Sequence, residues 1–281
     1  MNPVIQPAGL LQLKQQNEFV LIDARATKDA RQQYGQSHLA GALFVDMEED
    51  LATKTENAAN GGRHPLPSPE KFAAVLNALG ITPDSHVVVY DDKNGANAAA
   101  RFWWMLRAAG HKRVQVLDGG IQAAIAAGVP VSSQKEQPAQ TGNYAFDKWQ
   151  WPLATIEEVE QAAQQNDHLV IDVRDAYRYN GESEPIDLVA GHIPGAVNIP
   201  FSGNLNENGS FLPPEELLNR YKTVLEGKDP GNIIVHCGSG VTACHTILAM
   251  DIAGLDIPKL YVGSWSEWSR TDRPVAKNKM G

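Results

Sequence analysis

Cysteine is scarce in this chain: its 281 residues contain only two, Cys237 and Cys244. They lie seven positions apart, on what reads as one loop and the following helix, which argues against a disulfide framework. No spacing resembles a Cys-x-x-Cys pair or two histidines on one helix face. The sequence therefore predicts no metal or other cofactor, and we expect a reducing, cytoplasmic location.

Long apolar runs and an excess of basic charge are also missing. No stretch approaches the roughly 18 consecutive apolar residues of a membrane span. Met1–Gln16 lacks the basic segment and apolar core of a signal peptide, so we expect no membrane partner. The formal net charge is −9, which argues against nucleic acid as a general partner.

What the chain does contain is a repeat. Four segments of the first half recur in the second half in the same order: 21–25 as 170–174, 37–42 as 191–196, 87–90 as 233–236, and 117–120 as 261–264. The simplest account is two copies of one domain, residues 1–135 and 153–281, with a polar linker at 136–152.

Each half alternates short apolar runs with amphipathic stretches. The β-branched runs typical of buried strands are 87–90, 114–117, 170–173 and 233–236. Helix starts are indicated at Ser68–Glu70, Thr155–Glu158 and Pro213–Glu215. Glycines stand where helices should end, at Gly80, Gly110, Gly128, Gly227 and Gly254. The fold class is therefore α/β, with parallel sheets flanked by helices and ligand chemistry at the carboxyl ends of strands.

Cys237 directly follows the predicted strand 233–236 and precedes a helical stretch at 243–253. We expect Gly238 and Gly240 to take positive φ, so that backbone N–H groups turn inward. These groups and the helix dipole favour a thiolate. The alternative is a structural cysteine beside a tight turn, but the paired glycines favour a functional one. Cys244 lies in an apolar stretch and is expected in the core.

The hexapeptide Cys237–Thr242 resembles the active-site loop of the 3-mercaptopyruvate branch of the rhodanese family. Residues 191–196 resemble that family's inner signature and residues 263–268 its C-terminal signature. The resemblance spans nearly the whole chain. It implies tandem rhodanese-like domains, the second catalytic, with an active site facing the domain interface. Cys237 would carry sulfur as a persulfide, and the substrate-binding loop residues would be Gly238, Gly240, Val241 and Thr242.

The resemblance also implies a proton relay that would assist the departing pyruvate enolate. Ser239 and His64 match the family's serine and histidine, and Glu48 falls where the family places an aspartate. Each has a plainer interpretation. Ser239 would satisfy the loop backbone, His64 would be a surface histidine, and Glu48 would belong to a solvated acidic run.

The two signals for the sulfur donor disagree. Arg178 matches the first of two family arginines that hold the mercaptopyruvate carboxylate, but Ile186 stands at the second position. Arg63 is a candidate for the missing charge. The thiosulfate branch has two basic residues directly after the cysteine, where this chain has Gly238 and Ser239. 3-Mercaptopyruvate is therefore the favoured donor and thiosulfate the alternative, with a thiol, cyanide or a thioredoxin-like protein as acceptor.

The first half has Asp91 where the second has Cys237, so we expect the first half to be catalytically silent. Residues that both halves share, among them Asp172, Arg174 and His192, are then expected to support the fold. Related cysteine phosphatases carry an arginine six residues after the cysteine, where this chain has Ala243, which argues against phosphatase activity. The remaining alternative is a non-catalytic binding or sulfur-relay module.

Overall fold

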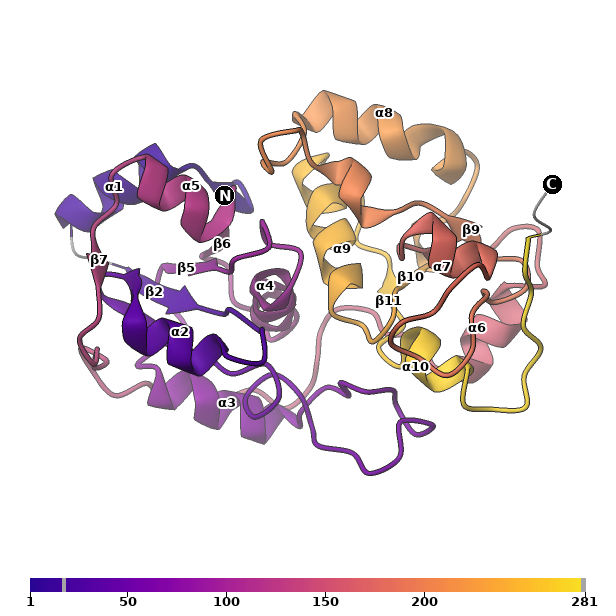
Figure 1. Cartoon of the computed structure of the whole chain (residues 1–281), viewed down its shortest axis with the longest axis horizontal. Helices are drawn as coiled ribbons and strands as arrows, with labels where there is room; N and C mark the ends of the chain where they lie inside the picture. Colours follow the sequence, from indigo (N-terminus) through magenta and orange to yellow (C-terminus); the bar gives the residue numbers. More distant parts are fainter. Residues whose placement is uncertain (17–18, 279–281) are drawn as a thin grey trace. The chain divides into compact units, whose positions relative to one another are not determined.

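The computed structural model describes residues 1–16 and 19–278 and contains two compact units (Figure 1). The first unit comprises Met1–Thr53, Pro67–Trp151 and Glu207–Phe211. The second comprises Lys54–Leu66, Pro152–Asn206 and Leu212–Gly281. Residues 54–66 thus precede the predicted linker in sequence but pack with the second unit.

The first unit is built on a five-stranded parallel sheet in the order β1-β6-β5-β2-β4. Its strands are β1 (Val4–Ile5), β2 (Val20–Asp23), β4 (Ala42–Phe44), β5 (Val87–Tyr90) and β6 (Val114–Leu117). A small antiparallel pair accompanies it, β3 (His38–Leu39) with β7 (Val131–Ser132). The helices are α1 (Pro7–Gln16), α2 (Ala30–Gln36), α3 (Pro69–Ala78), α4 (Ala98–Ala108) and α5 (Gly120–Ala126).

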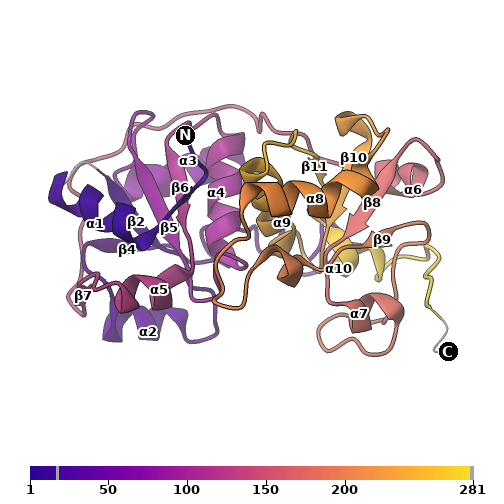
Figure 2. The same cartoon turned by 90° about the horizontal axis from the view of Figure 1, so that it is seen from above.

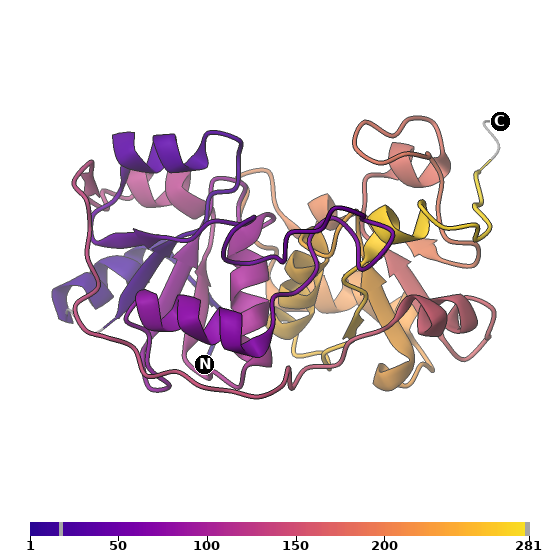
Figure 3. The same ribbon diagram turned by 90° about the horizontal axis from the view of Figure 1, so that it is seen from below.

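Helices cover both faces of this sheet. On one face, Leu10 of α1 and Ile121 of α5 share a buried cluster with Val88 of β5. Figures 2 and 3 show α3 and α4 on the opposite face. Because both faces are covered, all four residues of β5 are buried, which explains its continuous apolar sequence.

The second unit repeats this plan with a four-stranded parallel sheet in the order β11-β10-β8-β9. Its strands are β8 (Leu169–Asp172), β9 (Val197–Asn198), β10 (Ile233–His236) and β11 (Lys259–Leu260). Its helices are α6 (Ile156–Ala162), α7 (Ala176–Asn180), α8 (Pro214–Leu225), α9 (Thr242–Ile252) and α10 (Ser264–Trp268), with 3-10 turns at η1 (Phe201–Asn204) and η2 (Pro230–Asn232). The order matches β6-β5-β2-β4, so the sequence repeat is also a repeat of topology.

The predicted elements are present, with small shifts at their ends. Thr155 caps α6 through a capping box with Glu158, and α3 begins with Pro69 at its first position. The strand expected at 170–173 and the helix expected at 243–253 each begin one residue earlier, as β8 and α9. Such terminal shifts are ordinary, because the ends of elements have few hydrogen bonds of their own.

Both halves bury the same ion pair and the same ring stack. Arg174 donates from Nη2 to Asp172 at 2.6 Å, and Arg25 does the same to Asp23 at 2.7 Å. The ring of His192 stacks on Tyr179 in the second unit, as the ring of His38 stacks on Tyr34 in the first. Both units make these contacts although only the second has a cysteine after the corresponding strand, which supports the expectation that they serve the fold.

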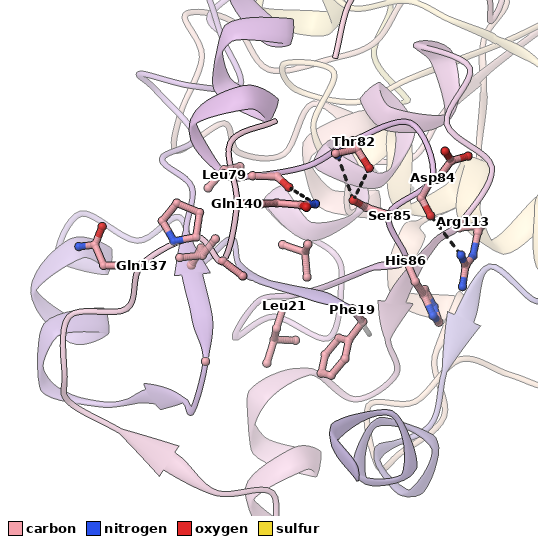
Figure 4. A pocket seen from close by; sticks show the side chains of 16 residues that line it. Phe19, Leu21, Leu79, Thr82, Asp84, Ser85, His86, Arg113, Gln137 and Gln140 are labelled. Atoms are coloured by element: carbon pink, nitrogen blue, oxygen red, sulfur yellow. Dashed lines mark hydrogen bonds between the residues drawn. The ribbon is translucent and has the colours of Figure 1, made fainter. Parts of the chain in front are cut away.

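A cavity of about 470 Å³ lies in the first unit near the amino ends of β2 and β5 (Figure 4). Several of its polar groups are paired. Ser85 Oγ accepts from the Thr82 N–H at 3.0 Å, and Arg113 donates to the Asp84 carbonyl at 3.1 Å. Ligand chemistry in parallel sheets is found at the carboxyl ends of strands, so the candidate site lies elsewhere.

Candidate functional site

Cys237 directly follows β10, at the carboxyl end of the second sheet, and is 3% exposed. Its N–H donates to Ser264 Oγ at 3.2 Å, and its carbonyl accepts from the Trp265 N–H at 3.0 Å. His236 lies beneath the loop as the fully buried end of β10, and burial lowers its pKa. The backbone of Cys237 is therefore held in place by the strand before it and by the segment around α10.

The loop after Cys237 reaches the N-terminus of α9 at Thr242. Gly240 has φ +74°, and a Cβ there would lie 2.6 Å from the Val262 carbonyl oxygen, so this position requires glycine. The positive φ expected at Gly238 is wrong. Gly238 matters for another reason: a Cβ there would lie 3.2 Å from Arg63 Nη2 and 3.6 Å from Arg178 Nη2. The absence of a side chain leaves room for two guanidinium groups beside the nucleophile loop.

Arg178, on α7, is held by two carboxylates. Its Nη2 donates to Glu184 at 2.6 Å and to Asp187 at 3.5 Å. Burial opposes the charge on Arg178. Its bonds to Glu184 and the negative charges of Glu184, Asp187 and Cys237 outweigh that effect and raise its pKa. The guanidinium therefore stays charged and keeps a fixed direction toward the loop.

Asp187 is the acid that organises the arginines, and sequence reasoning missed its role. Its side chain is 0% exposed, and it also accepts from Arg63 Nε at 3.1 Å and from Arg270 Nη1 at 3.1 Å. An acid directly after Ile186, where an arginine was expected, was the available signal. Ile186 itself is 55% exposed. The second guanidinium beside Gly238 thus comes from Arg63.

The two predicted relay residues of the second unit meet. His64 Nδ1 lies 2.8 Å from Ser239 Oγ, although the two residues are 175 positions apart in sequence. That distance is within the range required for proton transfer between a base and a hydroxyl. Glu48 is exposed and belongs to the first unit, where its N–H donates to Asp46 at 3.0 Å, so its part in the relay stays a prediction.

Asp91, at the end of β5, occupies the position of Cys237 in the first unit. Its fully buried carboxylate accepts four backbone N–H groups, from Lys93, Gly95, Asn97 and Ala99, at 2.8 to 3.2 Å. The loop of the first unit is therefore already filled by a carboxyl group of its own, although burial raises the pKa of Asp91. We expect no persulfide there.

These four hydrogen bonds make Asp91 important for the stability of the first unit. Asp91→Ala leaves four backbone donors without their acceptor, two of them in buried bonds, and each orphaned buried donor costs about 1–3 kcal/mol. We expect a loss of at least about 3 kcal/mol in the free energy of unfolding, measured by urea denaturation. Asp92→Ala is the matched control, since the buried Oδ1 of Asp92 has no hydrogen-bond partner. Equal effects of the two changes would contradict this reading.

Neither cysteine forms a disulfide, and Cys244 is fully buried in α9, as expected. In the described part of the chain, no group of three or more His, Cys, Asp or Glu side chains is arranged to hold a metal ion. Among the same residues, no helix is both long and apolar enough to cross a membrane.

Comparisons with known proteins agree with the repeat. The rhodanese-like domain family matches residues 6–127 and again 155–271. The chain is 43% identical to the probable 3-mercaptopyruvate sulfurtransferase of Pseudomonas aeruginosa, over 86% of this chain and 85% of the relative. It is 39% identical to the thiosulfate sulfurtransferase of Gallus gallus, over 89% and 84%. The 3-mercaptopyruvate sulfurtransferase structure from Leishmania major superposes with a TM-score of 0.82 at 30% identity, covering 95% of this chain and 74% of that one.

Proposed function

Because the chain belongs to the rhodanese-like domain family and is a sulfurtransferase, we propose that it takes sulfur from 3-mercaptopyruvate onto Cys237. The persulfide then passes its outer sulfur to a thiol, cyanide or a thioredoxin-like protein. The observation that carries the choice of donor is the 2.8 Å contact of His64 Nδ1 with Ser239 Oγ, beside the nucleophile loop. A donor with a carbanionic leaving group needs such a relay.

The chemistry balances without any cofactor. The Cys237 thiolate attacks the donor sulfur, the S–S bond forms, and the carbon–sulfur bond of the donor breaks. The electrons of that bond leave with pyruvate as its enolate, and a proton delivered through Ser239 and His64 converts the enolate to pyruvate. The proton is equivalent to the one on the donor thiol, so Cys237 is left as an ionised persulfide. Loop N–H groups and the α9 N-terminus favour that anion.

The donor carboxylate would bind between Arg63 and Arg178. Both guanidinium groups lie beside Gly238, and both are oriented by Asp187. Two cations at this place also suit the thiosulfate dianion, which keeps thiosulfate as the second candidate donor. In the thiosulfate branch the two basic residues directly follow the cysteine, whereas Arg63 and Arg178 lie outside the Cys237 loop.

The donor assignment is tested by removing one guanidinium at a time. Arg178→Ala and Arg63→Ala should each lower kcat/KM for 3-mercaptopyruvate by about 10- to 150-fold, since each removes a charge-assisted hydrogen bond. Arg270→Ala is the control, because Arg270 bonds the same Asp187 carboxylate, whereas the atoms nearest to a Cβ at Gly238 belong to Arg63 and Arg178. A higher kcat/KM for thiosulfate in the unmodified enzyme would overturn the assignment.

The catalytic domain is the one built around residues 153–281, and the domain around residues 1–135 is silent because Asp91 fills its loop. Two thiols outside any disulfide suit a reducing compartment such as the cytoplasm. The competing reading, a non-catalytic relay module, predicts no turnover even when Cys237 can be loaded with sulfur.

A further inference from the structure

The segment that carries Arg63 and His64, residues 54–66, has almost no core of its own. Every residue in it is described, and Gly62 alone is buried. Apolar packing therefore contributes little to its position. Its placement depends on the few specific contacts that it makes with the rest of the second unit.

Three of these contacts converge on residues 263–267, at the start of α10. The Gly61 N–H donates to Glu267 Oε1 at 2.8 Å, and the Arg63 N–H donates to Ser266 Oγ at 3.0 Å. Between them, Gly62 lies directly on Gly263: an added Cβ would be 2.4 Å from the Gly263 carbonyl oxygen. The three residues before His64 thus all contact one short segment, residues 263–267, which we call the seat.

Ser266 connects this seat to the nucleophile loop. Its N–H donates to the Gly238 carbonyl at 2.8 Å, and its Oγ donates to the Gly263 carbonyl at 2.9 Å while accepting from Arg63 N–H. The residue is 0% exposed. One buried side chain and its own backbone therefore join the residue after Cys237 to the residue before His64.

We propose that Ser266 is a positioning residue that sets His64 against Ser239 by seating the 61–63 backbone on α10. The inference rests on the proposed donor chemistry. Proton transfer needs a separation of about 2.6–3.2 Å, and a displacement of about 1 Å can cost roughly 10²-fold in rate. The sulfite that leaves from thiosulfate is a stable anion that needs no proton, so the seat matters for 3-mercaptopyruvate above all.

Two neighbouring glycines provide a matched test. Gly61 and Gly62 have φ +88° and +81°, so alanine strains both backbones similarly. The Cβ of Gly61→Ala would meet only Pro65, at 3.5 Å, whereas that of Gly62→Ala would collide with Gly263. Gly62→Ala and Ser266→Ala should lower the single-turnover rate with 3-mercaptopyruvate about 10²-fold, and lower its ratio to the thiosulfate rate at least about 10-fold. Gly61→Ala should keep the ratio of the unmodified enzyme.

Two measurements separate positioning from a merely structural role. In a His64→Ala background, Ser266→Ala should cost much less with 3-mercaptopyruvate than it does in the unmodified enzyme, because only the placement of Arg63 is then still affected. The ¹⁵N shift of the His64 ring should report loss of the Ser239 contact in Ser266→Ala and Gly62→Ala, and its retention in Gly61→Ala. Equal losses for both donors, an undiminished cost without His64, or an unchanged ring shift would overturn the inference. An unmodified enzyme that ignores 3-mercaptopyruvate would overturn the donor assignment, while the ring shift would still test the seat.

Discussion

Cys237→Ser should form no persulfide and transfer no sulfur from either donor, because its hydroxyl oxygen cannot form the disulfide-type bond that holds the transferred sulfur. The structure offers no substitute close at hand. Cys244 is fully buried in α9, and its Sγ donates to the Gly240 carbonyl at 3.3 Å. Intact-mass measurement after incubation with 3-mercaptopyruvate or thiosulfate would show one added sulfur on the unmodified protein and none on this variant.

Cys244→Ser is the matched control for that experiment. The variant should still accept one sulfur, since Cys237 remains, and it should lose only the stability that the buried thiol contributes. A stable added sulfur on Cys237→Ser would contradict the assignment of the nucleophile. Loss of sulfur loading in Cys244→Ser, with folding intact, would contradict it equally.

Ser239→Ala and His64→Ala should each slow persulfide formation from 3-mercaptopyruvate by about 10²- to 10⁴-fold, the usual contribution of general acid–base catalysis. Each change removes the His64–Ser239 contact at 2.8 Å, so the enolate has no nearby proton donor. Thiosulfate should be affected far less, because sulfite leaves without protonation. Rapid mixing with each donor, followed by acid quench and detection of pyruvate or sulfite, measures both rates.

The double variant, Ser239→Ala with His64→Ala, tests whether the two residues act as one relay. If serine and histidine act as one relay, removing both should cost about as much as removing either, as for other groups that act together. Additive losses would mean that the two residues serve separate purposes. Ser239→Thr keeps the hydroxyl and should retain more activity with 3-mercaptopyruvate than Ser239→Ala.

Local sequence was sufficient for the elements and for proposing a nucleophile. A run such as 87–90, buried on both faces, must be continuously apolar, and helix ends need caps and positive φ within a few residues. Thr155, Pro69 and Gly240 could therefore be assigned from their neighbours, and Cys237 from the strand and glycine beside it. The repeat added an internal comparison, which identified Asp91 as the residue at the position of Cys237 in the first half.

The surroundings of Cys237 were decided by tertiary structure alone. Asp187 meets Arg63 across 124 positions of sequence, and Ser266 meets it across 203. No periodicity or cap signals such a pair, because hydrogen bonds between distant segments depend on where the chain returns after each strand. Gly238 shows the same limit: its local sequence suggested a positive φ, whereas its actual role is to leave space for two guanidinium groups. The sequence by itself thus determined the fold, the repeat and the choice of Cys237 as the proposed nucleophile. The tertiary structure decided which charged groups and which serine–histidine pair lie near its loop.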